Sequence, residues 1–257
     1  MARTEDKITL YWLNDSRAQN ILWLLEALQL PYEVKIFKRS PEGFAPEELK
    51  KVNPLGKSPV ITIERPGKPN PLVLFESGNI VEYLVDHYGG AEKGLVPKRY
   101  LDGNSGEETE SWRRYRFFLH YAEGSLMPNL VFHYVLMRVR EAPLPFFIRF
   151  IPRLVANKIQ SAFLDKQYAV HFPFLENQLK TAPGVDENTE GWLCGRDLTA
   201  ADILMSFGLI EAMEEGVIQE SKFPRLVAYI KRLQANETYK RAVAKVADSE
   251  GKPTASL

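Results

Sequence analysis

The chain of 257 residues is long enough for one large or two modest domains, and its 45% of apolar residues suffices for a sizeable core. Lys plus Arg equals Asp plus Glu at 33 each, so a general electrostatic attraction to nucleic acid is not expected. The single cysteine, Cys194, excludes an intramolecular disulfide and a cysteine-rich metal site, and we expect no bound metal. The charged start of the chain does not match a secretory signal, and no apolar run reaches the ~20 residues of a spanning helix. We therefore expect a soluble, cytoplasmic protein.

The chain begins with alternating strand and helix patterns. A short apolar run over residues 8–13 predicts a buried strand, and the helical spacing of apolar residues over 18–28 predicts a helix. Ser16 and Gln19 have the spacing of a capping box at the start of this helix. Alternating apolar residues over 32–37 then predict a second strand, which gives a β-α-β unit.

A second group of elements completes this half of the chain. We expect a short helix over residues 46–51 within a polar loop, and two strands over 60–63 and 72–75. The segment between these strands is rich in proline and glycine, so we expect them to form a hairpin. An apolar helical stripe follows from Ser77.

Helices dominate the remainder. Glycines and few apolar residues mark a linker over 91–108, which separates a predicted domain 1–90 from an all-helical domain 109–257. Helical spacing is found over residues 112–127, 130–140, 152–179, 199–214 and 224–246. Thr199 and Asp202 have capping-box spacing, and Cys194 is expected to be a small buried residue.

One segment of the helical half has an unusual composition. Residues 143–155 are aromatic, proline-rich and basic. We interpret them as a buried connection between helices. Covering a pocket, extending a dimer contact, or touching a membrane surface as an amphipathic segment are the alternatives.

Two motifs within this order of elements resemble the glutathione transferase family. The first is the run Asn-Pro-Leu-Gly-Lys-Ser-Pro-Val from Asn53 to Val60, and the second is the pair Glu76-Ser77 at the head of a helix. The resemblance covers nearly the whole chain and implies an α/β thioredoxin-like N-terminal domain followed by an all-α C-terminal domain. The fungal branch typified by yeast transferases associated with the endoplasmic reticulum is most similar, through residues 12–18, 22–25 and 122–126.

The resemblance implies that the N-terminal domain binds glutathione. In the family, a cis proline at the position of Pro59 turns the backbone of Ser58 toward the cysteinyl part of the tripeptide, a short form of strand addition. Ser77 at a helix N-terminus suits the γ-glutamyl carboxylate, and Glu76 suits the α-amino group. Pro59 as the start of an edge strand and Ser77 as a simple N-cap are the structural alternatives.

The glycyl carboxylate needs a basic partner. Lys57 is one candidate, although a solvated turn lysine is an equal interpretation. Related classes place a Lys or His shortly before the segment that matches 45–49, and this chain lacks that residue. Arg39 is the second candidate.

The catalytic group must lower the pKa of the glutathione thiol, because the thiolate is the nucleophile. The position that often holds a hydroxyl in the family matches Leu13, which donates nothing. Ser16 and Asn14 are the nearest donors, with backbone N–H groups of the first helical turn as a third choice. Arg17 would supply positive potential, unless it serves only as an ion-pair partner. No cysteine lies in this loop, which argues against a cysteine-based mechanism.

The helical domain would hold the electrophile. Tyr115, Phe118 and Met127 are the candidates for lining its pocket, with core packing as the alternative for each. The resemblance thus predicts a homodimeric glutathione transferase of detoxification and stress response, with glutathione as co-substrate and a small hydrophobic electrophile. Peroxide reduction would accompany conjugation, and the enzyme would be cytoplasmic or peripheral on the endoplasmic reticulum membrane. A glutathione-dependent disulfide reductase and a non-catalytic binding module on the same fold remain alternatives.

Overall fold

The computed structural model describes residues 5–102, 104–186 and 189–250. Its N-terminal part is a four-stranded sheet in the order β2-β1-β3-β4. The strands are β1 (Lys7–Leu13), β2 (Tyr32–Phe37), β3 (Val60–Glu64) and β4 (Leu72–Phe75). Strand β1 runs parallel to β2 and antiparallel to β3, and the antiparallel pairing of β3 with β4 confirms the predicted hairpin.

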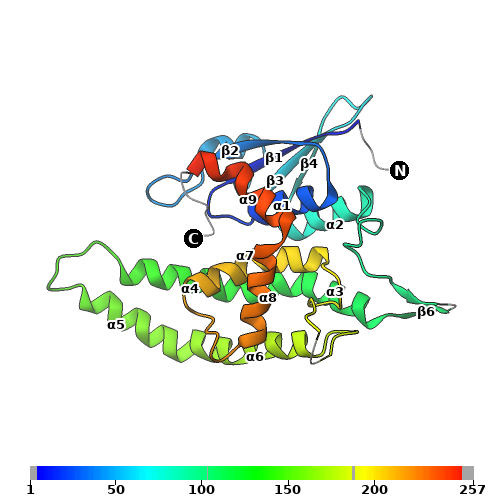
Figure 1. Ribbon diagram of the computed structural model, residues 1–257. Coiled ribbons are helices and arrows are strands. Elements are labelled where there is room, and N and C mark those ends of the chain that lie inside the picture. The colour runs from blue at the N-terminus through cyan, green and yellow to red at the C-terminus, as the bar shows by residue number, and fades with distance from the viewer. Residues whose placement is uncertain (1–4, 103, 187–188, 251–257) are drawn as a thin grey trace.

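The helices of the sheet part are α1 (Ala18–Leu28), the short 3-10 helix η1 (Glu47–Lys51) and α2 (Ser77–His87). α1 and α2 lie between the sheet and the helical part of the molecule (Figure 1). Nine of the 11 residues of α1 are buried, because α1 packs against the sheet as well as against helices of the other part. This mixed sheet with its two helices is the thioredoxin-like arrangement that the sequence predicted.

The second part consists mainly of helices. They are α3 (Glu110–Tyr121), α4 (Met127–Arg140), α5 (Phe150–Ile159), α6 (Asp165–Lys180), α7 (Ala200–Glu214), α8 (Pro224–Ala235) and α9 (Glu237–Glu250). π-Helical turns η2 (Ala122–Leu126) and η3 (Gln160–Leu164) join α3 to α4 and α5 to α6 without a break. The two composite helices run alongside each other (Figure 1).

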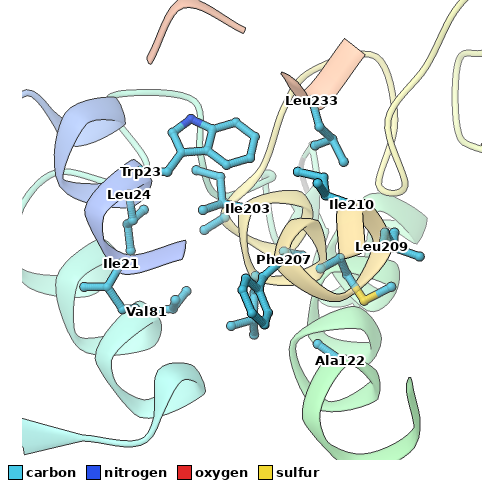
Figure 2. Close-up of a cluster of buried hydrophobic side chains, with 14 of the residues drawn as sticks. Ile21, Trp23, Leu24, Val81, Ala122, Ile203, Phe207, Leu209, Ile210 and Leu233 are labelled. Carbon is cyan, nitrogen blue, oxygen red and sulfur yellow. The ribbon is translucent and has the colours of Figure 1, made fainter. Parts of the chain in front are cut away.

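Helix α7 connects the two parts. Thirteen of its 15 residues are buried, which explains why its sequence is apolar on every side. Figure 2 shows α7 in the middle of a hydrophobic cluster, with Ile203 and Phe207 directed toward α1 and α2. A polar contact fixes the orientation: Asn20 of α1 donates to the Leu204 carbonyl at 2.9 Å and accepts from the Ser206 hydroxyl at 3.0 Å.

One expectation about an element boundary was wrong, and one segment holds strands that the sequence did not predict. The predicted helix over 224–246 is divided into α8 and α9 at Asn236, whose extended backbone and side chain begin the second helix by accepting the Thr238 N–H at 2.9 Å. The predicted linker contains a small hairpin of β5 (Tyr100–Leu101) and β6 (Asn104–Glu108), strands too short and polar to show in the sequence pattern. The domain limits at residues 90 and 109 stay predictions.

The connection between α4 and α5 is not buried, which corrects the interpretation of segment 143–155. Phe146 is 83% exposed and Phe147 and Phe150 are each 63% exposed. α4 and α5 extend away from the rest of the molecule, so among the described residues their connection has no neighbouring element to pack against (Figure 1).

Candidate functional site

A cavity of about 220 Å³ lies where the sheet part meets α4 and α7. Its lining comes from the loop after β1, the loops after β2 and before β3, and two helices of the second part. The lining residues are Asp15, Ser16, Arg17, Arg39, Gly43, Ser58, Met127, Val131, Tyr134 and Phe207. The structure therefore brings together five residues that the sequence singled out from separate segments: Ser16, Arg17, Arg39, Ser58 and Met127.

Ser16 lies at the wall of this cavity, and its hydroxyl is already engaged. It donates to the Leu13 carbonyl at 2.7 Å and accepts the Ala18 N–H at 3.2 Å. The predicted capping box with Gln19 is wrong, since the polar atoms of the Gln19 side chain are buried with no hydrogen-bond partner among the described residues. The hydroxyl turns back toward β1 instead, and α1 begins at Ala18.

Backbone donors are available beside that hydroxyl. Within the described residues, the N–H groups of Ser16 and Arg17 make no backbone hydrogen bond. They immediately precede the 11-residue helix α1, whose N-cap is Arg17, and a helix N-terminus favours an anion through free N–H groups and the helix dipole. This end of the cavity therefore suits a negatively charged atom such as a thiolate.

Asn14 and Arg39 hold the loop after β1 in place. The Asn14 side chain accepts the Arg39 backbone N–H at 2.7 Å and donates to the Asp15 carboxylate at 2.7 Å. The Arg39 guanidinium donates to the carbonyl oxygens of Asn14, Asp15 and Gly43 at 3.0–3.1 Å. Because three carbonyls occupy its donors, Arg39 connects two loops of the cavity wall and is poorly placed as a free anion partner.

Asp15 contributes an acidic group to the cavity lining. Its backbone φ of 49° lies in the left-handed region, where Asp is one of the few tolerated side chains. Burial raises the pKa of its carboxyl, while the hydrogen bond from Asn14 and the charge of Arg39 act in the opposite direction. A raised pKa weakens the repulsion that this carboxyl would exert on an anion in the cavity.

Ser58 presents its backbone to the same region. The Ser58–Pro59 bond is cis, as the family resemblance implied. The Ser58 hydroxyl donates to the Tyr11 carbonyl at 3.0 Å and lies 3.5 Å from the Ser16 hydroxyl. No backbone hydrogen bond involves the N–H or C=O of Ser58 in the described part of the chain. The neighbouring Lys57 is exposed and forms no ion pair with any described residue.

The N-terminus of α2 is joined to the helical part by a residue that the sequence did not single out. Ser77 is buried, and its hydroxyl donates to one oxygen of Glu123 at 2.6 Å. The other oxygen of Glu123 accepts from the Arg17 guanidinium at 2.5 Å. Glu76, immediately before Ser77, is exposed and has a positive φ of 69°.

Glu123 belongs to the π-helical turn η2, a local widening that often occurs at functional sites. The run 122–126 was already one of the family marks, so the motif itself was the signal that could have drawn attention to Glu123. The carboxylate is 30% exposed and borders a surface depression that also includes Glu76 and Gly78. Two acidic side chains and a helix N-terminus therefore meet within one region.

The apolar wall of the cavity differs from the prediction. Met127 lies there as expected, but Tyr115 and Phe118 are 2% and 0% exposed within the hydrophobic core. They lie on the inward face of α3, whereas the cavity is lined by α4, the next α-helix in the chain. Val131 and Tyr134 of α4 lie at the cavity with Phe207 of α7. Met127, Val131 and Tyr134 have the spacing i, i+4, i+7, a signal that could have located this wall.

Thr199, Asp202 and Cys194, which the sequence also singled out, lie outside the cavity and have structural roles. Thr199 and Asp202 form the predicted capping box, and the buried Asp202 carboxylate also accepts from the Tyr229 hydroxyl at 2.9 Å. Cys194 is 2% exposed, and burial raises the pKa of its thiol, which keeps the thiol protonated and unreactive. Within the described ranges, no cluster of three or more His, Cys, Asp or Glu side chains is placed to hold a metal ion.

Two family models match the chain: the glutathione S-transferase N-terminal domain over residues 16–87 and the glutathione S-transferase C-terminal domain over 152–245. The chain is 32% identical to glutathione S-transferase 1 of Saccharomyces cerevisiae, covering 90% of this chain and 92% of the yeast protein. A glutathione S-transferase structure from Actinobacillus pleuropneumoniae is similar with a TM-score of 0.66 and 27% identity, over 93% of this chain and 92% of that one.

A structure of Ure2p5 from Phanerochaete chrysosporium, crystallised with 1-(S-glutathionyl)-2,4-dinitrobenzene, has a TM-score of 0.66. It covers 95% of this chain and 96% of that one, at 18% sequence identity. At this identity the similarity concerns the fold.

Proposed function

Because the chain belongs to the glutathione S-transferase family, we propose that it binds glutathione and transfers it, as the thiolate, to small apolar electrophiles. The cavity at Ser16 is the proposed place of reaction, since it combines free backbone donors with an apolar wall. The ligand of Ure2p5 is a product of such a transfer to an aromatic ring, which supports a nitro-substituted aryl halide as the first substrate to test.

The central part of glutathione is proposed to pair with Ser58. The peptide N–H and C=O of its cysteinyl residue would meet the C=O and N–H of Ser58, which have no backbone partners among the described residues. Ser58 lies next to the cavity, so this pairing would place the thiol toward Ser16 and the N-terminus of α1.

The γ-glutamyl end is proposed to bind at the N-terminus of α2. Its carboxylate would take the Ser77 hydroxyl and the neighbouring N–H groups, which requires Glu123 to release that hydroxyl. The ammonium group would then lie between the carboxylates of Glu123 and Glu76, both of which border the same depression. Glu123 would thus give up the hydrogen bond from the Ser77 hydroxyl and bind the positively charged ammonium group of glutathione instead.

The glycyl carboxylate is proposed to pair with Lys57. Arg39 was the other candidate, but its guanidinium donors already serve three carbonyl oxygens. Lys57 is exposed, and its ammonium has no ion-pair partner within the described residues. Its contribution should be modest because the charge lies in solvent.

Thiol activation is proposed to occur at the N-terminus of α1. The N–H groups of Ser16 and Arg17 and the Ser16 hydroxyl would stabilise the thiolate, and the hydroxyl must leave the Leu13 carbonyl to do so. Asn14 would support this arrangement by holding the loop after β1 in place through its hydrogen bond to Asp15. Arg17 would support it by its positive charge, although its guanidinium also pairs with the Glu123 carboxylate. The electrophile would approach from the wall formed by Met127, Val131, Tyr134 and Phe207.

The observation that carries this proposal is the backbone of Ser58 beside the cavity, which pairs with no other backbone group of the described residues. The test combines calorimetry with glutathione and a conjugation assay with a nitro-substituted aryl chloride. Binding of reduced glutathione together with conjugation is expected. If glutathione does not bind, the protein is a non-catalytic module with the same fold. If oxidised glutathione binds more tightly than reduced glutathione, the result favours a disulfide reductase.

The wider biological role is part of the same proposal. We propose peroxide reduction by bound glutathione, a homodimeric state, and a role in detoxification or stress response by analogy with the family, and each needs a separate measurement. Sedimentation of the purified protein measures the oligomeric state, and a hydroperoxide assay measures the second activity. Microscopy of a fluorescent fusion distinguishes a cytoplasmic distribution from one at the endoplasmic reticulum membrane.

A further inference from the structure

The connection between α4 and α5 exposes an unusual amount of apolar surface. We define the tip as residues 143–155. Its exposed apolar side chains, with their exposed fractions, are Phe146 (83%), Phe147 (63%), Phe150 (63%), Ile151 (50%), Leu154 (68%) and Val155 (49%). Scattered exposed apolar residues are ordinary, but a contiguous group of this kind marks an interaction surface.

The orientation of α5 explains this exposure. Phe150, Ile151, Leu154 and Val155 follow the spacing i, i+1, i+4, i+5, which puts them on one face of the helix. Ala156 is fully buried and Ile159 packs partly buried against the core, so these two side chains lie on the inward face of α5. A helix of a water-soluble protein turns its apolar stripe to the core, whereas α5 turns it outward.

Positive charge accompanies the apolar face. Arg149, Arg153 and Lys158 are exposed on or beside the tip, and Arg138 lies in the last turn of α4. Within the described residues, none of these four side chains forms an ion pair. The charge of the whole chain is balanced, so this concentration of cations is a local feature.

We propose that the tip docks on a membrane surface that contains anionic lipids. Aromatic and aliphatic side chains flanked by Arg and Lys are the composition that binds the boundary between lipid headgroups and acyl chains. The ten residues of α5 span roughly 15 Å, about half of a bilayer core, so the helix would lie along the surface. No described helix is long and apolar enough to cross a bilayer.

A second copy of the chain is a poorer occupant for this surface. Two tips placed face to face would bring the exposed cations of Arg149 and Arg153 against their own copies, which costs energy in a desolvated contact. An anionic lipid surface satisfies the cations and the apolar side chains together. Charge complementarity therefore selects the membrane.

The tip is also continuous with the reaction cavity. Val131, Val135 and Val139 of α4 are 46%, 46% and 37% exposed and are spaced by four residues, so they form one exposed stripe. Val131 lines the cavity, and Val139 lies at the last turn before the tip. Docking by the tip would therefore place the lipid surface at the end of an apolar track that leads to the cavity, a consequence that rests on the proposed function.

The test is co-sedimentation of the full chain with vesicles of phosphatidylcholine alone and of phosphatidylcholine with 30 mol% (about one third) phosphatidylserine. Binding to the anionic vesicles that weakens with salt is expected. Replacing Arg149 and Arg153 by Gln should lower the partition coefficient on the order of 25-fold, since each cation near such a surface contributes about fivefold. Replacing Phe146 and Phe147 by Ser should lower it roughly tenfold or more.

Matched controls use residues of similar exposure elsewhere. Val170→Ser removes a 66% exposed side chain of α6, and Lys68→Gln with Lys180→Gln removes two exposed cations far from the tip in sequence. Both controls should bind like the original chain. The proposal is overturned if the chain ignores anionic vesicles at low salt, if the tip and control variants lose binding equally, or if Phe146→Ser with Phe147→Ser dissociates a dimer in solution. Glutathione conjugation measured without lipid tests the proposed function separately.

Discussion

The Ser77 hydroxyl and the Glu123 carboxylate, 46 residues apart in sequence, share a hydrogen bond of 2.6 Å. Glu123 also binds Arg17, so a single carboxylate joins the first turns of α1 and α2 to the π-helical turn of the second part. In the proposed reaction these two helix N-termini receive the thiolate and the γ-glutamyl carboxylate. Glu123 therefore positions Arg17 at one end of the proposed site and would bind the glutathione ammonium at the other end.

Glu123→Gln tests that role. The amide keeps the shape but loses the charge that would hold the glutathione ammonium and Arg17, so KM for glutathione should rise about tenfold while kcat changes little. Steady-state kinetics with varied glutathione measures this. Glu220→Gln, which removes a carboxylate paired with Lys231 on the surface, is the matched control and should leave KM unchanged. An equal KM in both variants would contradict the assignment.

A second prediction concerns the proposed role of the Ser16 hydroxyl in activating the thiol. Ser16→Ala should lower kcat/KM for conjugation on the order of 100-fold, the loss expected for one donor aimed at a developing or stabilised anion. Ser206→Ala is the control, since Ser206 is also buried and its hydroxyl also donates to the carbonyl three residues earlier at 2.7 Å. If both variants keep full activity, the backbone N–H groups alone activate the thiol.

The apolar wall is tested by filling the cavity. Val131→Trp places a large ring at its lining, so kcat/KM for an aryl halide should fall at least tenfold, about 1.4 kcal/mol, without a change in glutathione affinity. Val135→Trp adds the same ring one helical turn further, at a position with the same 46% exposure that does not line the cavity. Matching losses in the two variants would show that the cavity is not where the electrophile reacts.

Stability should depend on pH through His171. The Tyr121 hydroxyl lies 2.6 Å from His171 Nδ1, and burial lowers the pKa of this imidazole, so the folded state favours its neutral form. The unfolded chain takes up the proton first as pH falls below about 6.5, so stability present above that value is lost as pH falls through the lower folded pKa. Thermal melting between about pH 7 and pH 5.5 should show this decline.

His171→Gln should make that decline shallower, because its side chain no longer takes up a proton in either state. The rest of the decline should remain, since burial also lowers the pKa of the half-buried His133. The exposed His120 provides the control, and His120→Gln should melt with the same pH dependence as the original chain. A slope unchanged in His171→Gln would assign the acid sensitivity to other groups.

The sequence was sufficient to predict those helices, strands and caps that depend on a local residue pattern. Strands β1 to β4 and helices α1 and α2 follow from apolar spacing, and the capping box of Thr199 and Asp202 follows from its residue types. Glu123 was missed because its two partners come from distant segments, and a charged residue in a helix gives no local sign of them. The same limit applied to Tyr115 and Phe118, since an apolar residue on a helix is equally compatible with core and cavity until neighbouring helices are placed.

The tip shows a different limit. An apolar, basic run over 143–155 was interpreted as buried because apolar residues usually are, yet the helices that carry it extend beyond the core (Figure 1). Whether a segment is buried depends on which other elements lie next to it in the folded protein. Composition alone identified the segment as unusual without deciding which surface it meets.

The pKa of the glutathione thiol in the complex tests the central claim most directly. Ultraviolet titration of the thiolate, with protein in excess over glutathione, should give a value at least about one unit below the ~8.5 of an ordinary cysteine thiol, with the shift reduced in Ser16→Ala. A thiol that titrates at its ordinary pKa when bound would contradict the proposal that the N-terminus of α1 activates sulfur.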